Sequence, residues 1–341
     1  MSKYNLITGA TGIVGIHLML NLLQRGERVR AMVRKSSDTT IARRIFAYYD
    51  NESLFNNIDW IEGDMLDPDS LHRAIDGCQR IFHTAAMVSF DKRDHDTLWQ
   101  TNVDATAYLV DMALECGVEA FCHVSSIGAL GHESDGVITE STHWQPDNTR
   151  SVYSQSKFRQ EMEIWRGIQC GLNATIVNPG VILGPGTMGR SSQQILQTIV
   201  KGVPFYVDGR TGYTDARDVA HAMIELTLAE KWGERYIIVG HNSSVRDLQV
   251  LFAKALETKA PSIKAGHNLI MCAAYLTEAW NKITGSRNPL TVESARSMGG
   301  ENYYSSEKLL ETINIQFTPL EESVRNMVSF YKYNKNITHE Q

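Results

Sequence analysis

The chain has 341 residues, a formal net charge of −6 at pH 7, 43% hydrophobic residues and 21% charged residues. These values are ordinary for a globular protein with a substantial core, arranged as one large unit or two closely joined domains. The acidic balance, without a basic run longer than Arg43-Arg44, argues against nucleic acid as the main partner.

The first half of the chain alternates short apolar runs with helical patterns, which is typical of βαβ units and a parallel sheet. Strands are expected at residues 4–8, 28–33, 58–62, 80–84, 120–125 and 173–178. Helices are expected from the first glycines to Gly26, around 71–75, over 98–116 and over 153–170. We therefore predict an α/β fold with a doubly wound parallel sheet, a Rossmann fold, with its ligand at the carboxyl ends of the strands.

The pattern is less regular after Gly184. Helices are expected at 191–201, 218–229, 245–257, 270–284, 307–313 and 320–331, with short strands near 204–207 and 236–239. We predict a nucleotide-binding Rossmann domain over residues 1–180. Residues 181–341 are expected to form a smaller α/β substrate-binding region, partly interleaved with the first domain.

Three glycines follow the first strand and open the first helix, which is the context that a dinucleotide-binding fingerprint requires. Small residues let the backbone approach a pyrophosphate, and the helix N-terminus supplies amide donors and a positive dipole. The spacing is GxxGxxG, and dinucleotide binding is favoured over a structural turn. The residues expected at the cofactor are Gly9, Thr11, Gly12, Ile13, Val14 and Gly15.

The end of the second strand bears on the choice of cofactor. An NAD site usually has an acidic residue there, whereas this chain has Arg34, whose guanidinium can pair with a 2′-phosphate. We therefore expect NADP, with NAD as a possibility.

After the third strand, Asp64-Met65 can meet the adenine, or Asp64 can cap the helix near Pro68. Ala85-Ala86, after the fourth strand, offer small side chains beneath the cofactor.

Tyr153 and Lys157 lie four residues apart and share one face of the predicted helix. A nearby ammonium favours the phenolate and is expected to lower the pKa of Tyr153 toward working pH. Tyr153 is then a candidate proton donor and acceptor for a carbonyl/alcohol pair. Taken alone, this pair is more often an ordinary surface contact of a helix.

Several motifs occur together in one order, namely TGATGIVG (8–15), GDMLD (63–67), HTAA (83–86), NVDAT (102–106), SSIGALG (125–131), YSQSK (153–157), NPGVILGPG (178–186) and TDARDVA (214–220). In this the chain resembles the extended short-chain dehydrogenase/reductase family, also called the NAD-dependent epimerase/dehydratase superfamily. AMVRKSSD (31–38) and GVILGPG (180–186) are most similar to the branch of dihydroflavonol 4-reductases and 3β-hydroxysteroid dehydrogenases.

The resemblance implies a role for each matching residue. Tyr153 would be the acid/base, Lys157 would bind the nicotinamide ribose, and Ser126 would hydrogen-bond the substrate oxygen. Further cofactor contacts are expected from Asn102, Ser125, Pro179, Gly180 and Val181. The implied reaction is hydride transfer between a nicotinamide and a small-molecule carbonyl or alcohol.

The substrate is expected to be a fairly apolar aldehyde or ketone, because the candidate pocket loops are apolar and aromatic. The candidate contacts are Met87, Leu130, His132, Met188, Tyr206 and Tyr213, with Phe90 and Trp144 on the same loops. Dehydratases of the family place Asp-Glu after the catalytic hydroxyl residue, where this chain has Ile127 and Gly128. A nucleotide-sugar epimerase and a non-catalytic NADP sensor remain as alternatives.

Other features bear on location and partners. The five cysteines show no CxxC spacing and predict free thiols, and neither a signal sequence nor an apolar span of about 20 residues is present, so we expect a cytoplasmic protein without a membrane partner. The histidines show no metal-ligand spacing, and no metal is expected. Asp215 and Arg217 replace the family's usual pattern, either as an ion pair or as altered substrate contacts. A homodimer through the helices at 98–116 and 153–170 is also expected.

Overall fold

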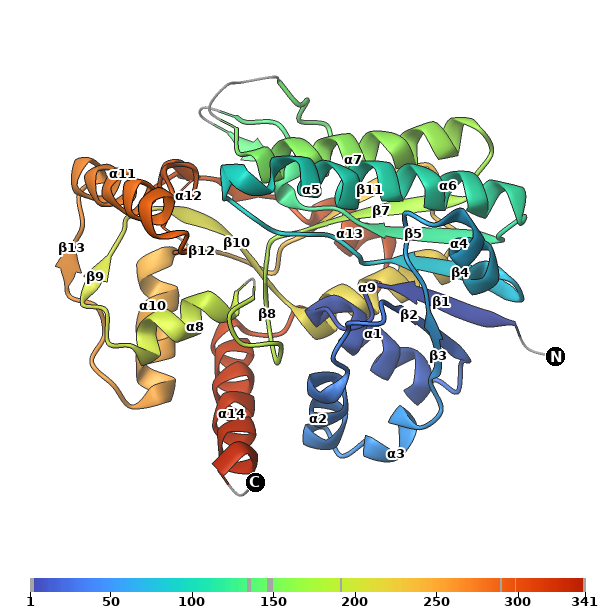
Figure 1. Ribbon diagram of the computed structural model, residues 1–341, viewed down its shortest axis with the longest axis horizontal. Coiled ribbons are helices and arrows are strands. Elements are labelled where there is room, and N and C mark those ends of the chain that lie inside the picture. The colour runs from blue at the N-terminus through green and yellow to red at the C-terminus, as the bar shows by residue number, and fades with distance from the viewer. Residues whose placement is uncertain are drawn as a thin grey trace.

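The computed structural model describes residues 3–133, 136–145, 150–190, 192–288, 290–297 and 299–339. Within them a seven-stranded parallel sheet runs in the order β11-β7-β5-β4-β1-β2-β3 (Figure 1). The strands are β1 (Tyr4–Thr8), β2 (Val29–Val33), β3 (Asp59–Glu62), β4 (Cys78–His83), β5 (Ala120–Val124), β7 (Ala174–Pro179) and β11 (Glu234–Ile238). Together with the helices on both faces, this order confirms the predicted doubly wound α/β fold.

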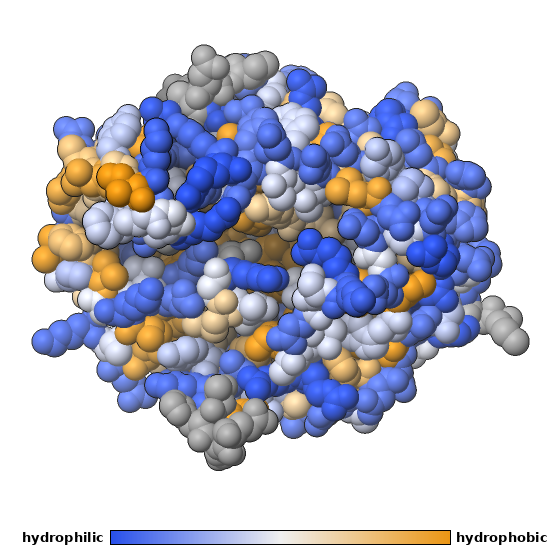
Figure 2. All heavy atoms as spheres, in the orientation of Figure 1, coloured by the Kyte–Doolittle hydropathy of each residue, from blue (hydrophilic) through white to orange (hydrophobic). Residues whose placement is uncertain are grey.

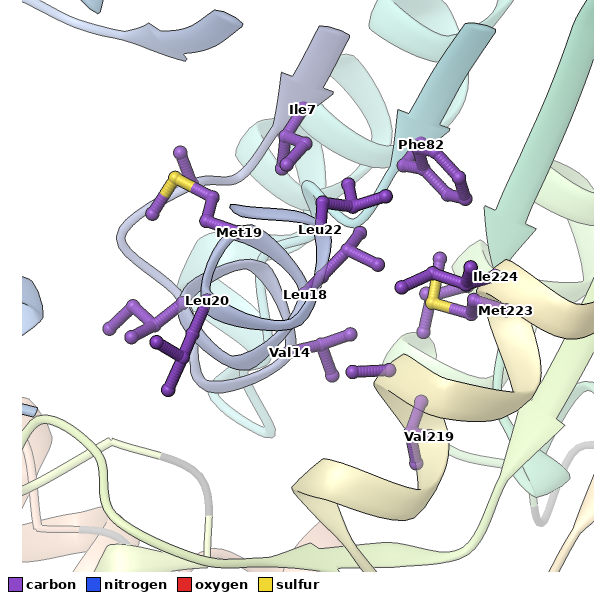
Figure 3. Packing of buried hydrophobic residues seen from close by; sticks show 14 of the residues in the cluster. Ile7, Val14, Leu18, Met19, Leu20, Leu22, Phe82, Val219, Met223 and Ile224 are labelled. Atoms are coloured by element: carbon purple, nitrogen blue, oxygen red, sulfur yellow. The ribbon is translucent and has the colours of Figure 1, made fainter. Parts of the chain in front are cut away.

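Helices cover both faces of this sheet (Figure 1). One face carries α1 (Ile13–Gln24), α2 (Thr40–Tyr48), α3 (Glu52–Phe55) and α9 (Ala216–Leu228). The other carries α4 (Pro68–Ile75), α5 (His95–Trp99), α6 (Ala105–Glu115) and α7 (Val152–Gln169). The largest apolar cluster lies between α1, α9 and the sheet, where Leu18 of α1 points toward Met223 and Ile224 of α9 (Figure 3). Burial of such side chains stabilises the fold by about 1.5–3 kcal/mol each.

The strand order reverses between β1 and β4, which places a crevice at the carboxyl ends of these two strands. Gly9 follows β1 with φ at +70°, and a Cβ atom there would lie 2.6 Å from the backbone nitrogen of Ala85, which follows β4. Only glycine tolerates both this conformation and this approach. The glycine loop and the Ala85-Ala86 turn therefore meet at the expected cofactor crevice.

The long helix predicted over 98–116 is interrupted. It starts earlier, as α5, passes through a π-helical turn at Gln100–Asp104, and continues as α6. A π turn inserts one residue into the helical repeat and is frequent at functional sites. Side-chain periodicity does not reveal it, because the apolar pattern continues on both sides.

The second half forms a smaller sheet of β12 (His241–Ser244), β10 (Arg210–Asp215) and β8 (Val181–Leu183), with helices α8 (Gln193–Val200), α10 (Val245–Leu256) and α14 (Leu320–His339) packed on it. Two parallel strand pairs join distant segments, β9 (Phe205–Tyr206) with β13 (Ile263–Lys264), and β6 (Val137–Ile138) with β14 (Tyr303–Tyr304). Strand β11, followed later by α13 (Glu307–Thr312), returns to the main sheet, so the two halves interleave. The boundary at residue 180 stays a prediction.

Helices α11 (His267–Thr284) and α12 (Val292–Ser297) lie at one end of the molecule. The outer side of α11 is apolar and exposed, with Leu276 at 73% and Ile283 at 82% of their surface accessible. Apolar residues gather there at the left of Figure 2. Across the described ranges, no helix combines the length and apolar character needed to span a bilayer.

Candidate active site

Tyr153 and Ser126 meet through their hydroxyl groups. Tyr153 is the second residue of α7, which starts after Ser151, whose hydroxyl accepts a hydrogen bond from the backbone N–H of Ser154 at 3.0 Å. Ser126 follows β5, and its oxygen also accepts the N–H of Gly128 at 3.0 Å. Burial raises the pKa of Tyr153, and the hydrogen bond with Ser126 acts in the opposite direction. At neutral pH the phenol therefore holds its proton.

Lys157 is almost fully buried one helical turn after Tyr153. Its ammonium donates hydrogen bonds to the carbonyl oxygen of Val124, at 2.8 Å, and to Oε1 of Gln160. Burial lowers the pKa of Lys157 to about 7, against the opposing influence of the Glu161 carboxylate. The expectation that Lys157 lowers the pKa of Tyr153 is wrong for this structure, because the ammonium is directed at Val124 and Gln160 and burial dominates at the phenol.

A buried chain of hydrogen bonds connects Lys157 to the start of the glycine loop. Thr8 Oγ1 lies 2.7 Å from His83 Nδ1, and His83 Nε2 lies 2.8 Å from Thr106 Oγ1. Gln160 then donates to Thr106 Oγ1 at 2.9 Å and accepts from Lys157. Burial, followed by the charge of Lys157, lowers the pKa of His83 to about 3, so its ring is neutral. This series of hydrogen bonds fixes the position of the Lys157 side chain relative to β1 and β4.

A buried ion pair lies behind the serines. Glu161 and Arg235 are 3.0 Å apart, and Glu161 also accepts from Ser125 Oγ at 2.7 Å and from Asn178 Nδ2 at 2.9 Å. The same amide of Asn178 donates to the carbonyl oxygen of Ser126 at 3.0 Å. The hydroxyl of Ser125 is thus occupied by Glu161, so only the backbone of Ser125 is available for the predicted cofactor contact. Sequence reasoning missed Glu161 and Gln160, although their spacing from Lys157 places them one turn along the same helix.

Asn102 is fully buried in the π-helical turn. Its Oδ1 accepts from the N–H of Met87 at 2.7 Å, and its Nδ2 donates to the Met87 carbonyl and to Ser156 Oγ, both at 3.0 Å. Both amide N–H groups are therefore used within the protein. Asn102 ties the segment after β4 to α7, so it acts by positioning that segment rather than by offering its side-chain N–H groups to a cofactor.

The glycine loop presents a helix N-terminus suited to an anion. Gly12 precedes α1 without a side-chain cap, and the first turn carries no acidic residue. A Cβ atom on Gly15 would lie 2.9 Å from Cα of Ala10, so the helix packs closely against the loop. Val14 is buried in the core and Ile13 packs against it, so these two residues can reach a diphosphate only through their amides. Of the other two residues expected at the cofactor in this loop, Thr11 is half-buried and Gly12 is exposed.

Arg34 is exposed directly after β2, and its guanidinium forms no ion pair with another described residue. Asp64 accepts a hydrogen bond from the N–H of Leu66 at 2.9 Å, whereas the cap of α4 is Asp67. The alternative of Asp64 as the helix cap is therefore wrong, because α4 begins at Pro68 as expected but Asp67, the residue directly before it, is the cap. Met65 packs partly against the cluster beneath α4 and α6.

The segment after β7 passes tightly over the second sheet. Pro179 and Gly180 are buried, and Val181 is half-buried at the start of β8. A Cβ atom on Gly180 would lie 2.7 Å from the carbonyl carbon of Gly212 and 3.1 Å from the backbone nitrogen of Tyr213. A side chain at residue 180 would collide with the backbone of β10, so this crossing requires glycine.

The predicted substrate residues separate into distinct groups. Phe90 lies against Tyr153, with ring centroids 5.8 Å apart, and Met87 is half-buried on the same segment. Leu130 and Tyr213 were wrong as substrate contacts, because they are 0% and 2% exposed within apolar clusters. The other three are placed as follows: His132 is exposed, Met188 packs against the cluster around α8 and α10, and Tyr206 lies 4.5 Å beneath the Arg246 guanidinium.

Two further expectations are resolved. Arg217 and the buried Asp215 form a two-pronged ion pair with both distances at 2.9 Å, which confirms the ion-pair alternative. All five cysteines are free, as predicted. In the described ranges no three His, Cys, Asp or Glu side chains gather as metal ligands would.

Comparison with known proteins gives a consistent result. The sequence model of the NAD dependent epimerase/dehydratase family matches residues 5–239. A Synechocystis sp. protein assigned, provisionally, as a dihydroflavonol 4-reductase is 27% identical over 96% of this chain and 94% of its own. Sterol demethylase protein B of Methylococcus capsulatus is 34% identical over 70% of each chain. The crystal structure of gox2253 superposes with a TM-score of 0.80 at 30% identity, covering 98% of this chain and 99% of the other.

Proposed function

This chain belongs to the NAD-dependent epimerase/dehydratase family, and we propose that within it the chain is an NADP-dependent reductase of a fairly apolar aldehyde or ketone. The family and the named relatives are NAD(P)-dependent enzymes, and the presence of Tyr153, Lys157 and Ser126 supports an enzyme over a non-catalytic sensor. The observation that carries the proposal is the hydroxyl pair of Tyr153 and Ser126 beside the buried Lys157, at the carboxyl edge of the sheet.

The chain's own residues fit a dinucleotide. The open N-terminus of α1 can hold the diphosphate, and Gly9 leaves space where Ala85 approaches. Arg34 is free to pair with a 2′-phosphate, which supports NADP over NAD. The bound cofactor supplies the hydride.

In the proposed mechanism, Tyr153 and Ser126 serve the substrate oxygen. Because burial keeps Tyr153 protonated, its Oη can donate a proton as negative charge develops on that oxygen. Ser126 donates a second hydrogen bond and orients the carbonyl. Lys157 can turn from Val124 and Gln160 toward the cofactor ribose, and there its positive charge would stabilise the phenolate left after proton transfer.

Apolar walls support the substrate class. The Phe90 ring lies beside that of Tyr153 at an angle of 60°, and Met87 lies on the same segment. Relatives named for reduction include cinnamoyl-CoA reductase 1 of Petunia hybrida, 28% identical over 68% of this chain and 71% of its own. The aromatic rings of Phe90 and Tyr153 would accept a flat or ring-containing carbonyl compound by stacking.

The test is a cofactor-oxidation screen of the purified protein with NADPH and NADH. Aldehydes, ketosteroids and flavanonols form one panel, and nucleotide sugars form the other. We expect NADPH oxidation with a member of the first panel. Interconversion of nucleotide sugars without net cofactor oxidation would instead identify the epimerase alternative and contradict the proposal.

A further inference from the structure

Helices α11 and α12 form a small unit with a core of its own. Ala274, Val292 and Ala295 are buried against one another, with the partly buried side chains of Ile270, Met271 and Leu290 around them. Glu278 of α11 accepts a hydrogen bond from the N–H of Val292 at 2.8 Å, which closes the unit internally. All members of this apolar cluster lie within residues 270–295, and the opposite side of α11 is exposed.

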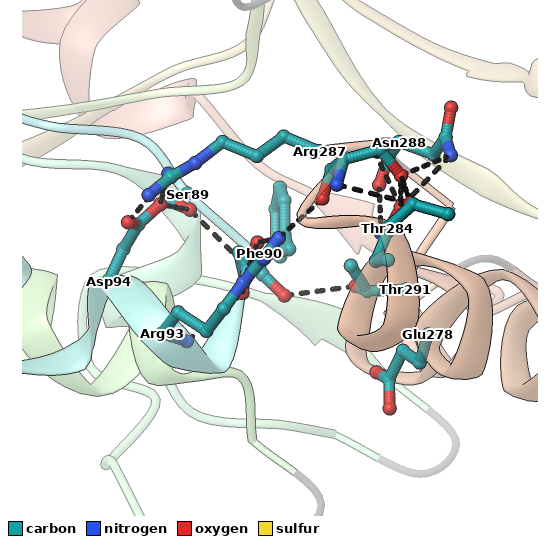
Figure 4. A network of polar contacts seen from close by, with 12 residues as sticks. Ser89, Phe90, Arg93, Asp94, Glu278, Thr284, Arg287, Asn288 and Thr291 are labelled. Atoms are coloured by element: carbon teal, nitrogen blue, oxygen red, sulfur yellow. Dashed lines mark hydrogen bonds and ion pairs between the residues drawn. The ribbon is translucent and has the colours of Figure 1, made fainter.

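The contacts that fasten this unit to the first half are polar, and in Figure 4 they reach the segment that carries Phe90, Arg93 and Asp94. Arg287 pairs with the buried Asp94 at 2.8 Å, and Arg93 donates to the carbonyl oxygen of Ser286 at 2.8 Å. Thr291 Oγ1 donates to the carbonyl oxygen of Phe90 at 2.9 Å. Phe90 is the residue whose ring lies against Tyr153.

Glu293 of α12 makes the remaining fastening, directly on the catalytic helix. Its Oε1 accepts the backbone N–H of Val152, the first residue of α7 and the neighbour of Tyr153. The first N–H groups of a helix have no partner within the helix, and a carboxylate there also interacts favourably with the positive end of the helix dipole. The other oxygen, Oε2, is buried and has no hydrogen-bond partner among the described residues.

We propose that Glu293 is a positioning residue that caps α7 and ties the placement of Tyr153 to the docking of the α11–α12 unit. This inference rests on the proposed function, since it assigns the site its acid. Val152 precedes Tyr153 and Phe90 packs on its ring, so undocking releases both the backbone and the ring of the tyrosine. The substrate carbonyl would then meet a fixed proton donor only when the unit is docked.

Three variants of the full-length protein separate this role from simple loss of packing. Glu293→Ala removes the acceptor, Glu293→Gln keeps a carbonyl oxygen in the same place, and Arg287→Ala loosens the unit without touching α7. For Glu293→Ala we expect kcat to fall roughly 10-fold or more, because misplacement of a reacting group by about 1 Å can cost 100-fold. Glu293→Gln should restore kcat to within about threefold, whereas Arg287→Ala should lower kcat in the same direction as Glu293→Ala, because it weakens the docking of the whole unit.

Amide hydrogen exchange over residues 150–158 gives a readout independent of turnover. The N–H of Val152 should exchange faster in Glu293→Ala and remain protected in Glu293→Gln, with the Kd of NADPH unchanged in both. Unchanged exchange and kcat in Glu293→Ala would overturn the proposal, as would an equal loss of kcat in Glu293→Ala and Glu293→Gln. If the wild-type protein reduces no carbonyl, the proposed function fails, and the exchange result alone decides whether Glu293 caps the helix.

Discussion

Lys157 and Val124 are joined by a hydrogen bond of 2.8 Å from the buried ammonium to the backbone carbonyl oxygen at the end of β5. Ser126 follows two residues after Val124, and Tyr153 lies one helical turn before Lys157. The lysine therefore braces the strand and the helix that carry the two hydroxyl groups. Its burial also makes its protonation sensitive to the cofactor.

The first prediction concerns proton uptake. With a pKa of about 7, Lys157 is mostly neutral at pH 8, and hydrogen bonds to ribose hydroxyls favour its charged form. Binding of NADPH at pH 8 should therefore take up on the order of half a proton or more. Calorimetry in buffers of different ionisation enthalpy measures this number. Lys157→Met should remove the uptake, and an identical uptake in the variant would assign it to another group.

The second prediction concerns cofactor choice. Arg34→Ala should raise KM for NADPH about 10-fold or more, because a hydrogen bond to a charged group contributes about 1.5–3 kcal/mol. KM for NADH should stay unchanged, since the unphosphorylated ribose has no partner for this cation. Arg159→Ala removes an exposed arginine from α7 and serves as the control. Equal effects on both cofactors would remove the argument for NADP.

The third prediction concerns Gly180. Alanine there places Cβ against the backbone of Gly212, so we expect the free energy of unfolding in urea to fall by about 2 kcal/mol or more. Gly266→Ala is the matched control, because Gly266 has φ at −66° and no atom within 4 Å of the added methyl group. Gly266 precedes α11 as its N-cap, so about 1 kcal/mol or less is expected of the control, and an equally small loss at Gly180 would mean that β8 and β10 can separate.

The fourth prediction concerns the buried pair of Glu161 and Arg235. Arg235→Met leaves the carboxylate without its cation and should lower the free energy of unfolding by about 3–5 kcal/mol. Adding Glu161→Gln should recover most of that loss, since the amide oxygen still accepts from Ser125 and Asn178. The two single variants and the double variant, unfolded in urea, measure the coupling. Additive losses would show that the pair is not coupled.

The sheet and the helices of the first half were predictable, because each strand is a short apolar run and the glycines mark where β1 ends. The π-helical turn around Asn102 was not, since it leaves the apolar pattern unchanged. Strands β8, β10 and β12 were missed for another reason. They are short or mixed in polarity, and their pairing depends on close backbone contacts such as that between Gly180 and Gly212.

Site residues that belong to a sequence motif were predictable. Residues whose role depends on how deeply the folded protein buries them were less so. Leu130 and Tyr213 look like pocket residues in the sequence but are covered by β11 and by α8 and α10. Gln160 and Glu161 are polar residues on a helix with an exposed side, and only the tertiary structure buries them. Glu293 reaches Val152 across 141 positions of the chain, and no local pattern indicates such a contact.

The measurement that bears most directly on the central claim is the turnover of Tyr153→Phe with NADPH and a carbonyl substrate found in the screen. The change removes only the phenolic oxygen and keeps the ring beside Phe90. We predict a loss of kcat of at least about 100-fold, the scale of general acid catalysis, with the Kd of NADPH unchanged. Turnover close to that of the wild-type protein would contradict the assignment of Tyr153 as the proton donor.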